Sequence, residues 1–166
     1  MSKAVMLSIR PKWCEKIASG EKTIEVRKTR PKLDTPFKCY IHCTQSGVAL
    51  GARGKHGKVI GEFTCDRIDR LAPANEPYGI YDIDDDYVLQ TCLENGALWD
   101  YGRGTPLCGW HISGLRIYDA PRELREFERP YECNECDAKW ATECNACHEE
   151  GKIKRPPQSW CYVEEG

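Results

Sequence analysis

The 166-residue sequence has no long hydrophobic run. Polar residues interrupt its first apolar stretch, residues 4–9, and no segment approaches the roughly 20 apolar residues that span a bilayer. The N-terminus also lacks the basic-then-apolar pattern of a secretory signal. We therefore expect a cytoplasmic protein without a membrane partner. The length allows one main core with room for a small appendage.

Neither sign of charge dominates, since 24 Lys and Arg residues face 26 Asp and Glu residues for a net charge of −2. The charges are unevenly placed: residues 1–75 hold 15 basic and 7 acidic side chains, and residues 76–166 hold 9 and 19. A basic half can present a positive patch to phosphates, whereas a uniformly acidic protein would repel a polyanion. A fold that interleaves the halves would cancel this field, and both alternatives stay open.

Eleven cysteines are present, and in a chain without a secretory signal they favour free thiols and a metal site over disulfides. Four of them form two Cys-x-x-Cys hooks separated by seven residues, Cys133-Asn-Glu-Cys136 and Cys144-Asn-Ala-Cys147. Four thiolates suit tetrahedral zinc and leave no open coordination position. The spacing predicts structural Zn²⁺; two redox dithiols or an iron–sulfur cluster are the alternatives.

This cysteine cluster lies in a segment of distinct composition. We expect residues 131–155 to be a zinc-knuckle insertion in a domain built from residues 1–130 and 156–166. The segment has few apolar residues, so bound metal would supply much of its order. His148 lies beside the second hook and could replace one ligand. The segment could also contact a protein partner.

The chain is organised around residues 20–28, and a short helix is predicted ahead of them at residues 11–19. Proline at position 11 and Gly20 suit the first position and the end of a short helix. From residue 23 the pattern changes to period two, which predicts a strand with Ile24 and Val26 on one face and Glu25 and Arg27 on the other. The charged pair is either exposed, and then worth about 0–1 kcal/mol, or it faces a ligand cleft with Lys22 at its lip.

The rest of the chain alternates strand-like and loop-like stretches. Residues 84–95 read as a helix opened by three aspartates, with an apolar stripe and Gly96 at its end. Gly61 predicts a bulge or a close backbone approach. Loops are expected at residues 29–36, 45–57 and 99–105, a short charged helix within 121–128, and strands at residues 4–10, 37–44, 58–65, 107–118 and 160–163.

Two stretches, Leu7-Ser8-Ile9-Arg10-Pro11 and Gly20-Glu21-Lys22-Thr23-Ile24-Glu25-Val26-Arg27, resemble the ASCH domain family. The signature Gly-x-Lys-x-x-Glu-x-Arg is matched at Gly20, Lys22, Glu25 and Arg27. The stretches Gly109-Trp110-His111-Ile112 and Pro157-Gln158-Ser159-Trp160-Cys161-Tyr162-Val163 resemble small bacterial and phage-borne members. The resemblance covers most of the chain outside the cysteine-rich segment. It implies an α+β, PUA-like fold, a small β-barrel with flanking helices, and a role on RNA or nucleotides.

The first functional hypothesis is an RNA- or nucleotide-binding module. Phosphates would be held by basic side chains, and a base would stack on an aromatic ring. Glu25 would orient Arg27 or accept a hydrogen bond from a base amine. The alternative for Trp13 is a core position, which its spacing of four residues from Ile17 favours. The candidate ligand-binding residues are Arg10, Lys12, Trp13, Lys22, Glu25, Arg27, Tyr40 and Trp160.

The second hypothesis is an enzyme. The resemblance implies either a 4-acetylcytidine amidohydrolase or a ribonuclease, and in the amidohydrolase branch a lysine, a threonine three residues later and a distant glutamate carry the chemistry. Lys22 matches that lysine, but Glu25 stands at the threonine position. A desolvated Lys22 beside Glu25 could still act as a base. Glu62 is a guess for the second carboxylate. A third hypothesis is a zinc-stabilised adaptor for a protein partner.

Overall fold

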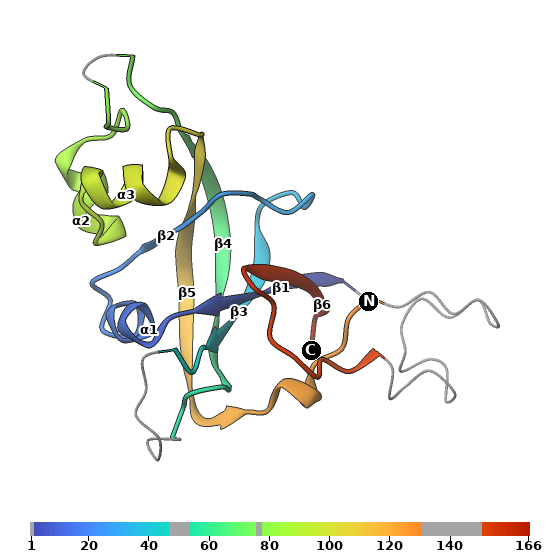
Figure 1. The fold of residues 1–166 in the computed structure, drawn as a ribbon. Coiled ribbons are helices and arrows are strands. Elements are labelled where there is room, and N and C mark those ends of the chain that lie inside the picture. The colour runs from blue at the N-terminus through green and yellow to red at the C-terminus, as the bar shows by residue number, and fades with distance from the viewer. Residues whose placement is uncertain (1, 47–53, 76–77, 131–150) are drawn as a thin grey trace.

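The computed structural model describes residues 2–46, 54–75, 78–130 and 151–166 (Figure 1). All of the cysteines in the two predicted zinc hooks lie outside the described residues. The elements, in chain order, are β1 (Lys3–Ile9), α1 (Pro11–Ala18), β2 (Ile24–Arg27), β3 (Phe37–Cys43), β4 (Val59–Leu71), α2 (Asp85–Thr91), α3 (Asn95–Gly102), β5 (Leu107–Arg122), the 3₁₀ turn η1 (Leu124–Glu126) and β6 (Trp160–Glu164).

The strands form one mixed sheet in the order β2-β5-β4-β3-β1-β6. Only β1 and β3 pair in parallel; the other neighbours are antiparallel. This confirms an α+β fold, but the expected barrel is not closed by backbone pairing. Within the described chain, β2 and β6 remain the two edges of the sheet. β2 has only four residues, so it offers too short a ladder to complete a ring.

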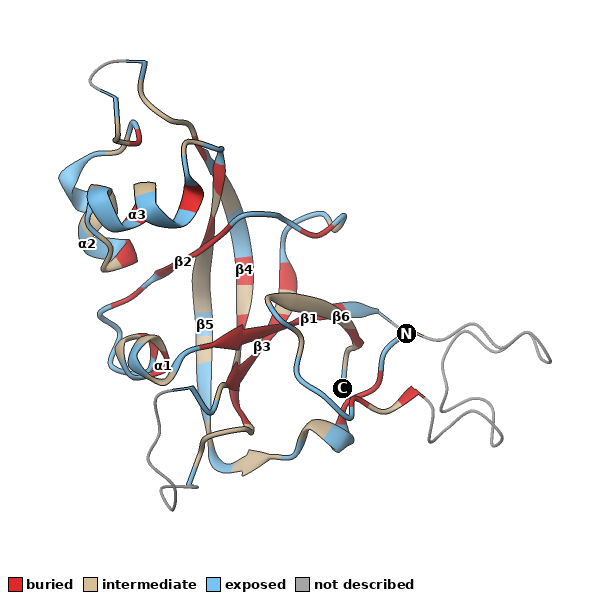
Figure 2. Cartoon of the chain, in the orientation of Figure 1, coloured by how far each residue is buried: buried red, intermediate tan, exposed pale blue. Residues whose placement is uncertain are grey.

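Both faces of the central strands are buried (Figure 2). In β1, Val5 and Leu7 belong to the main core, whereas Met6 joins a second cluster on the opposite face. β3 alternates in the same way, with Ile41 in the main core and Tyr40 in the second cluster. This period-two pattern is the one expected from the sequence, because successive side chains of a strand point to opposite faces.

The helical region differs from its prediction. Asp84 caps α2 as expected, its side chain accepting a 2.8 Å hydrogen bond from the backbone N–H of Tyr87. The single helix predicted to reach residue 95 is wrong, because α2 ends at Thr91. The hydroxyl of Thr91 donates to the carbonyl of Val88 and accepts from the N–H of Leu93. These side-chain bonds take the place of backbone hydrogen bonds that a continuing helix would make.

A second helix, α3, then begins at Asn95. Gly96 therefore lies inside a helix rather than at the end of one, and the predicted loop at residues 99–105 is helical up to Gly102. Leu89, expected in the apolar stripe, is 70% exposed. The four-residue spacing of apolar residues predicted one continuous helix face. The break between α2 and α3 changes the direction of the chain after Cys92, so that single face does not form.

β4 and β5, with 13 and 16 residues, are the longest strands described and form an antiparallel pair within the sheet. Both strands extend beyond their predicted ends, because each continues the ladder of the other after the apolar pattern stops. At Gly61 the prediction of a close approach is confirmed: an added Cβ would lie 2.5 Å from the carbonyl oxygen of Arg116. Of the helices described here, none has the length and apolar character to cross a membrane.

Candidate nucleotide-binding cleft

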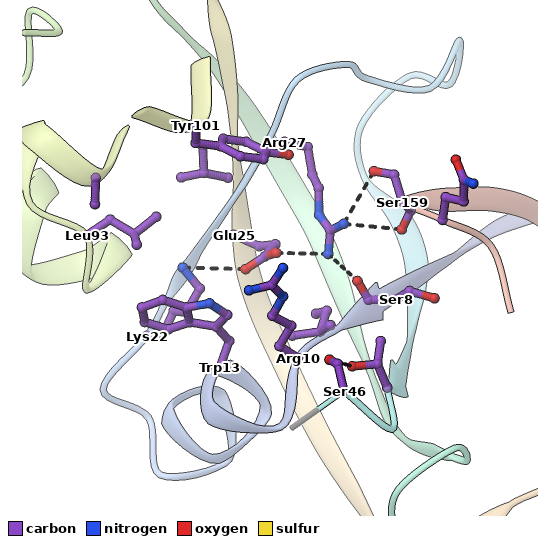
Figure 3. A pocket seen from close by; sticks show the side chains of 15 residues that line it. Ser8, Arg10, Trp13, Lys22, Glu25, Arg27, Ser46, Leu93, Tyr101 and Ser159 are labelled. Carbon is purple, nitrogen blue, oxygen red and sulfur yellow. Dashed lines mark hydrogen bonds and ion pairs between the residues drawn. The ribbon is translucent and has the colours of Figure 1, made fainter. Parts of the chain in front are cut away.

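A cleft of about 540 Å³ opens between α1, β2, α3 and the segment that precedes β6 (Figure 3). It lies on the side where the sheet is open, because residues from β2 and from the end of β1 both line it. Its lining residues are Ser8, Ile9, Arg10, Trp13, Lys22, Glu25, Val26, Arg27, Thr44, Ser46, Leu93, Ala97, Tyr101, Gln158 and Ser159.

Lys22 is placed at the cleft by the tight turn after α1, in which Gly20 has a φ of +82°. Its ammonium donates a 2.6 Å hydrogen bond to the carbonyl of Thr91 and lies 3.4 Å from a carboxylate oxygen of Glu25. The side chain is 1% exposed and its Nζ lies 5.2 Å from the ring centre of Trp13. Burial lowers the pKa of Lys22, and the Glu25 carboxylate opposes this effect.

Glu25 and Arg27 form a buried ion pair, with 2.9 Å between a carboxylate oxygen and Nη2 and 8% of each side chain exposed. This excludes the interpretation of a solvated surface pair. Arg27 also donates to the carbonyl oxygens of Ser8, at 2.8 Å, and Ser159, at 3.2 Å. The guanidinium thus connects the β2 edge with β1 and with the segment before β6, across the opening of the sheet.

Aromatic side chains from two helices border the cleft: Trp13 on α1 and Tyr101 on α3 lie on opposite sides of Glu25 (Figure 3). Trp13 is half-buried and packs against the main core, as its core interpretation predicts, and it also lines the cleft. Arg10 is exposed, and its guanidinium is directed into the cleft. The side chain of Arg10 makes no hydrogen bond or ion pair with any residue that the structure describes.

The family model of the ASCH domain matches residues 7–147. The chain belongs to the ASCH domain family. Three solved structures share its fold. The ASCH protein from Zymomonas mobilis has a TM-score of 0.62 and 18% identity, over 98% of this chain and 88% of that one. Two point-mutant forms of that protein give TM-scores of 0.59 and 0.60 at 17% and 18% identity, over 98% and 99% of this chain and 89% and 92% of theirs.

No curated protein matches the sequence. At these identities the structural likeness concerns the fold alone. The ASCH signature residues nevertheless have defined positions in this chain. At the bottom of the cleft Glu25 contacts both Lys22 and Arg27, and Gly20 provides the turn that carries Lys22 there.

Other predicted site residues lie elsewhere in this ASCH domain. Lys12 is outside the cleft lining, with its ammonium 4.7 Å from the ring centre of Trp13. Tyr40 is fully buried, and its hydroxyl is hydrogen-bonded to Gly166. Trp160 lies on β6, outside the cleft, and donates from Nε1 to Thr29. Glu62, the guess for a second carboxylate, accepts from the hydroxyl of Tyr118 and does not line the cleft.

Sequence reasoning missed Tyr101, Ser159 and the backbone acceptor Thr91. Tyr101 falls in the stretch that was predicted as a loop, and Thr91 in a helix predicted to run on. The cleft lining contains Arg10, Lys22 and Arg27 against the single carboxylate of Glu25. The basic surplus of the first half therefore persists at the cleft, because none of the second-half acidic residues that the structure describes lines it.

Proposed function

We propose that this cleft binds one nucleotide unit, free or within single-stranded RNA. ASCH domains are PUA-like modules of an RNA-binding family, and the proposal extends that role to particular side chains here. The observation that carries it is the buried Lys22–Glu25–Arg27 cluster at the bottom of an open cleft with aromatic sides. A volume of about 540 Å³ lies within the roughly 300–1,000 Å³ typical of small-molecule sites.

The base would occupy the inner part of the cleft. Unpaired bases are recognised by stacking on aromatic rings and by hydrogen bonds to their edges. Trp13 and Tyr101 offer the rings, and the Glu25 carboxylate offers an acceptor for a base amino group. Lys22 supplies a donor beside it, so one edge of the base would meet both an acceptor and a donor.

The phosphate would lie at the mouth of the cleft, on Arg10. The Nη atoms of Arg27 are engaged by Glu25, Ser8 and Ser159, which leaves Arg27 a supporting role. Arg10 has no such partners among the described residues, and it is exposed. Lys12 lies two residues after Arg10 and adds positive charge without lining the cleft. This division between Arg10 and Arg27 refines the role that the sequence assigned to both.

The test is calorimetric titration with mononucleotides at low salt. Trp13→Leu should weaken binding about 5- to 150-fold, because base stacking contributes about 1–3 kcal/mol. Arg10→Gln should weaken it and flatten its salt dependence. Arg70→Gln, which alters an exposed arginine of β4 outside the cleft, is the matched control. Equal affinities of all three variants and the wild type would contradict the proposal.

A second candidate is hydrolysis of a modified nucleoside or of RNA at the same cleft. The lowered pKa of Lys22, caused by its burial, makes the neutral amine more accessible as a base. Glu25 lies 3.4 Å away and could share the proton. Against amidohydrolase chemistry stands the glutamate at position 25, where the active branch has threonine.

We also propose a structural zinc in the segment 131–155. The support is the spacing of Cys133, Cys136, Cys144 and Cys147, which suits one tetrahedral ion. Across residues 2–46, 54–75, 78–130 and 151–166, no group of three or more His, Cys, Asp or Glu side chains is arranged to hold a metal. The hooks are therefore the place to look for zinc in this chain. A role in binding a protein partner remains a further use for the segment.

A further inference from the structure

A second pocket, of about 500 Å³, lies along β6. Its lining includes two aromatic residues, Trp160 and Tyr162, and two exposed basic residues, Lys3 and Arg129. It contains no acidic residue among those the structure describes. Trp160 was expected to serve the ligand-binding site but does not line the cleft, so its position here needs a separate explanation.

The two rings are held in a fixed arrangement. They meet edge to face, with centroids 5.4 Å apart and an interplanar angle of 78°. Their polar ends are already bonded: Trp160 Nε1 donates to Thr29 Oγ1 at 3.0 Å, and the Tyr162 hydroxyl accepts from the N–H of Lys32 at 2.7 Å. What the half-buried rings still offer a ligand is therefore apolar and aromatic surface, which suits stacking rather than hydrogen-bond recognition.

Positive charge accompanies this aromatic surface. The Lys3 ammonium lies 5.8 Å from the ring centre of Tyr162. Arg129, three residues after the end of η1, also lines this pocket. Aromatic rings combined with basic side chains along a groove are how proteins bind single-stranded nucleic acid without reading its sequence.

The second pocket adjoins the cleft. Gln158 lines both, and it is exposed. Its neighbour Ser159 lies in the cleft, where it accepts from Arg27, and the next residue, Trp160, lies in the second pocket. Two residues of chain span at most about 7 Å, so a ligand that leaves the cleft over Gln158 meets Trp160 directly.

We infer that the pocket along β6 binds the nucleotide next to the one in the cleft, so that single-stranded RNA crosses Gln158 from one pocket to the other. The inference rests on the proposed function of the cleft. Trp160 and Tyr162 provide the stacking surface for the second base, and Lys3 and Arg129 neutralise its phosphate. The protein therefore binds a short RNA strand more tightly than it binds a mononucleotide.

The experiment compares a mononucleotide with a five-nucleotide oligouridine on the same proteins. The double variant Lys3→Gln, Arg129→Gln changes only exposed side chains, so the fold is retained. It should weaken oligonucleotide binding at least 5-fold and reduce the slope of log affinity against log salt by about 0.7, the change expected for the loss of one phosphate contact. Mononucleotide affinity should stay unchanged. The double variant Arg70→Gln, Arg125→Gln, exposed and outside both pockets, is the control.

The outcomes separate this inference from the function proposed for the cleft. If the Lys3→Gln, Arg129→Gln variant binds the oligonucleotide as tightly as the wild type does, the second site is overturned and the cleft proposal is unaffected. The second site is also overturned if this variant loses the same amount of affinity for the mononucleotide and for the oligonucleotide. A wild-type protein that binds no mononucleotide, with an oligonucleotide affinity insensitive to Trp13→Leu, overturns the cleft. If that oligonucleotide affinity still depends on Lys3 and Arg129, the path across Gln158 is wrong as well, because the strand then lies on β6 alone.

Discussion

Nη2 of Arg27, in the edge strand β2, donates a 2.8 Å hydrogen bond to the carbonyl oxygen of Ser8 in β1. These strands are not neighbours in the sheet, since β5, β4 and β3 stand between them. The bond therefore links β2 and β1 across the open side of the sheet, where no backbone pairing connects these two strands. It also makes Arg27 the residue that connects the Glu25 carboxylate to the far wall of the cleft.

Replacing Arg27 by Ala should destabilise the protein strongly. The change removes bonds to Ser8 and Ser159 and takes one partner from the buried Glu25, a type of loss that typically costs about 3–5 kcal/mol. Urea unfolding measures it. Arg30→Ala, an exposed arginine three residues later, is the control and should stay within about 0.5 kcal/mol of the wild type. Equal unfolding midpoints for the two variants would show that the bridge across the opening is not structural.

The buried ammonium of Lys22 should give folding stability a pH dependence in the alkaline range. Its folded pKa lies below the ordinary value of 10.5 because burial disfavours the charge. Between those two pKa values the unfolded chain holds more protons than the folded one, so the free energy of unfolding rises with pH. Lys22→Met should lack this rise, whereas Lys12→Met, an exposed lysine of α1, should keep it. Urea titrations between pH 8 and 10.5, compared between the variants, provide the measurement.

The cysteine hooks predict about one zinc per chain in purified protein. Cys133→Ser and Cys144→Ser should each lower both the zinc content and the melting temperature, because metal supplies order that the segment lacks. Cys92→Ser, in the turn after α2, leaves the hooks intact and should keep the metal. Elemental analysis without zinc, or an iron–sulfur absorption band, would contradict this prediction.

Glu25→Gln distinguishes a binder from an enzyme. If Glu25 only holds Arg27 and accepts from the base, the amide should keep the shape of the cleft and weaken binding mildly. If Glu25 acts with Lys22 in catalysis, the same change should lower turnover by about 10²–10⁴-fold while ligand still binds. Incubation with acetylated cytidine nucleoside and with a mixed RNA oligomer, followed by mass spectrometry, is the assay. We expect little deacetylation; robust wild-type turnover that disappears in Glu25→Gln would reverse the order of the two candidates.

Local patterns predicted the helix α1 to within one residue of its end, the turn at Gly20 and the orientation of Glu25 and Arg27, because each depends on neighbours in the chain. The partners of Arg27 could not be predicted in that way. Ser8 and Ser159 are 19 and 132 residues from it, and they reach it only through the order of strands in the sheet. The alternation of apolar and polar residues along a strand also does not predict which face of the strand a distant segment will cover.

Tyr40 shows the consequence of that limit. The sequence predicted that Tyr40 binds the ligand. In β3 it lies on the face opposite Cys39 and Ile41. In the fold, Phe127 and Ile153 cover that face, and Tyr40 becomes part of a second core. Tyr101 shows the reverse, because a side chain expected in a loop is carried to the cleft by α3. Which aromatic residues meet the ligand is thus decided by packing between distant elements.

The most direct test of the account is a crystal structure of the protein with a mononucleotide such as CMP. The account predicts the base between Trp13 and Tyr101, with its edge toward Lys22 and Glu25 and its phosphate on Arg10. Arg27 should keep its bonds to Ser8 and Ser159 in that complex. A nucleotide bound at another surface, with the Lys22–Glu25–Arg27 cluster untouched, would contradict the assignment of this cleft as the nucleotide site.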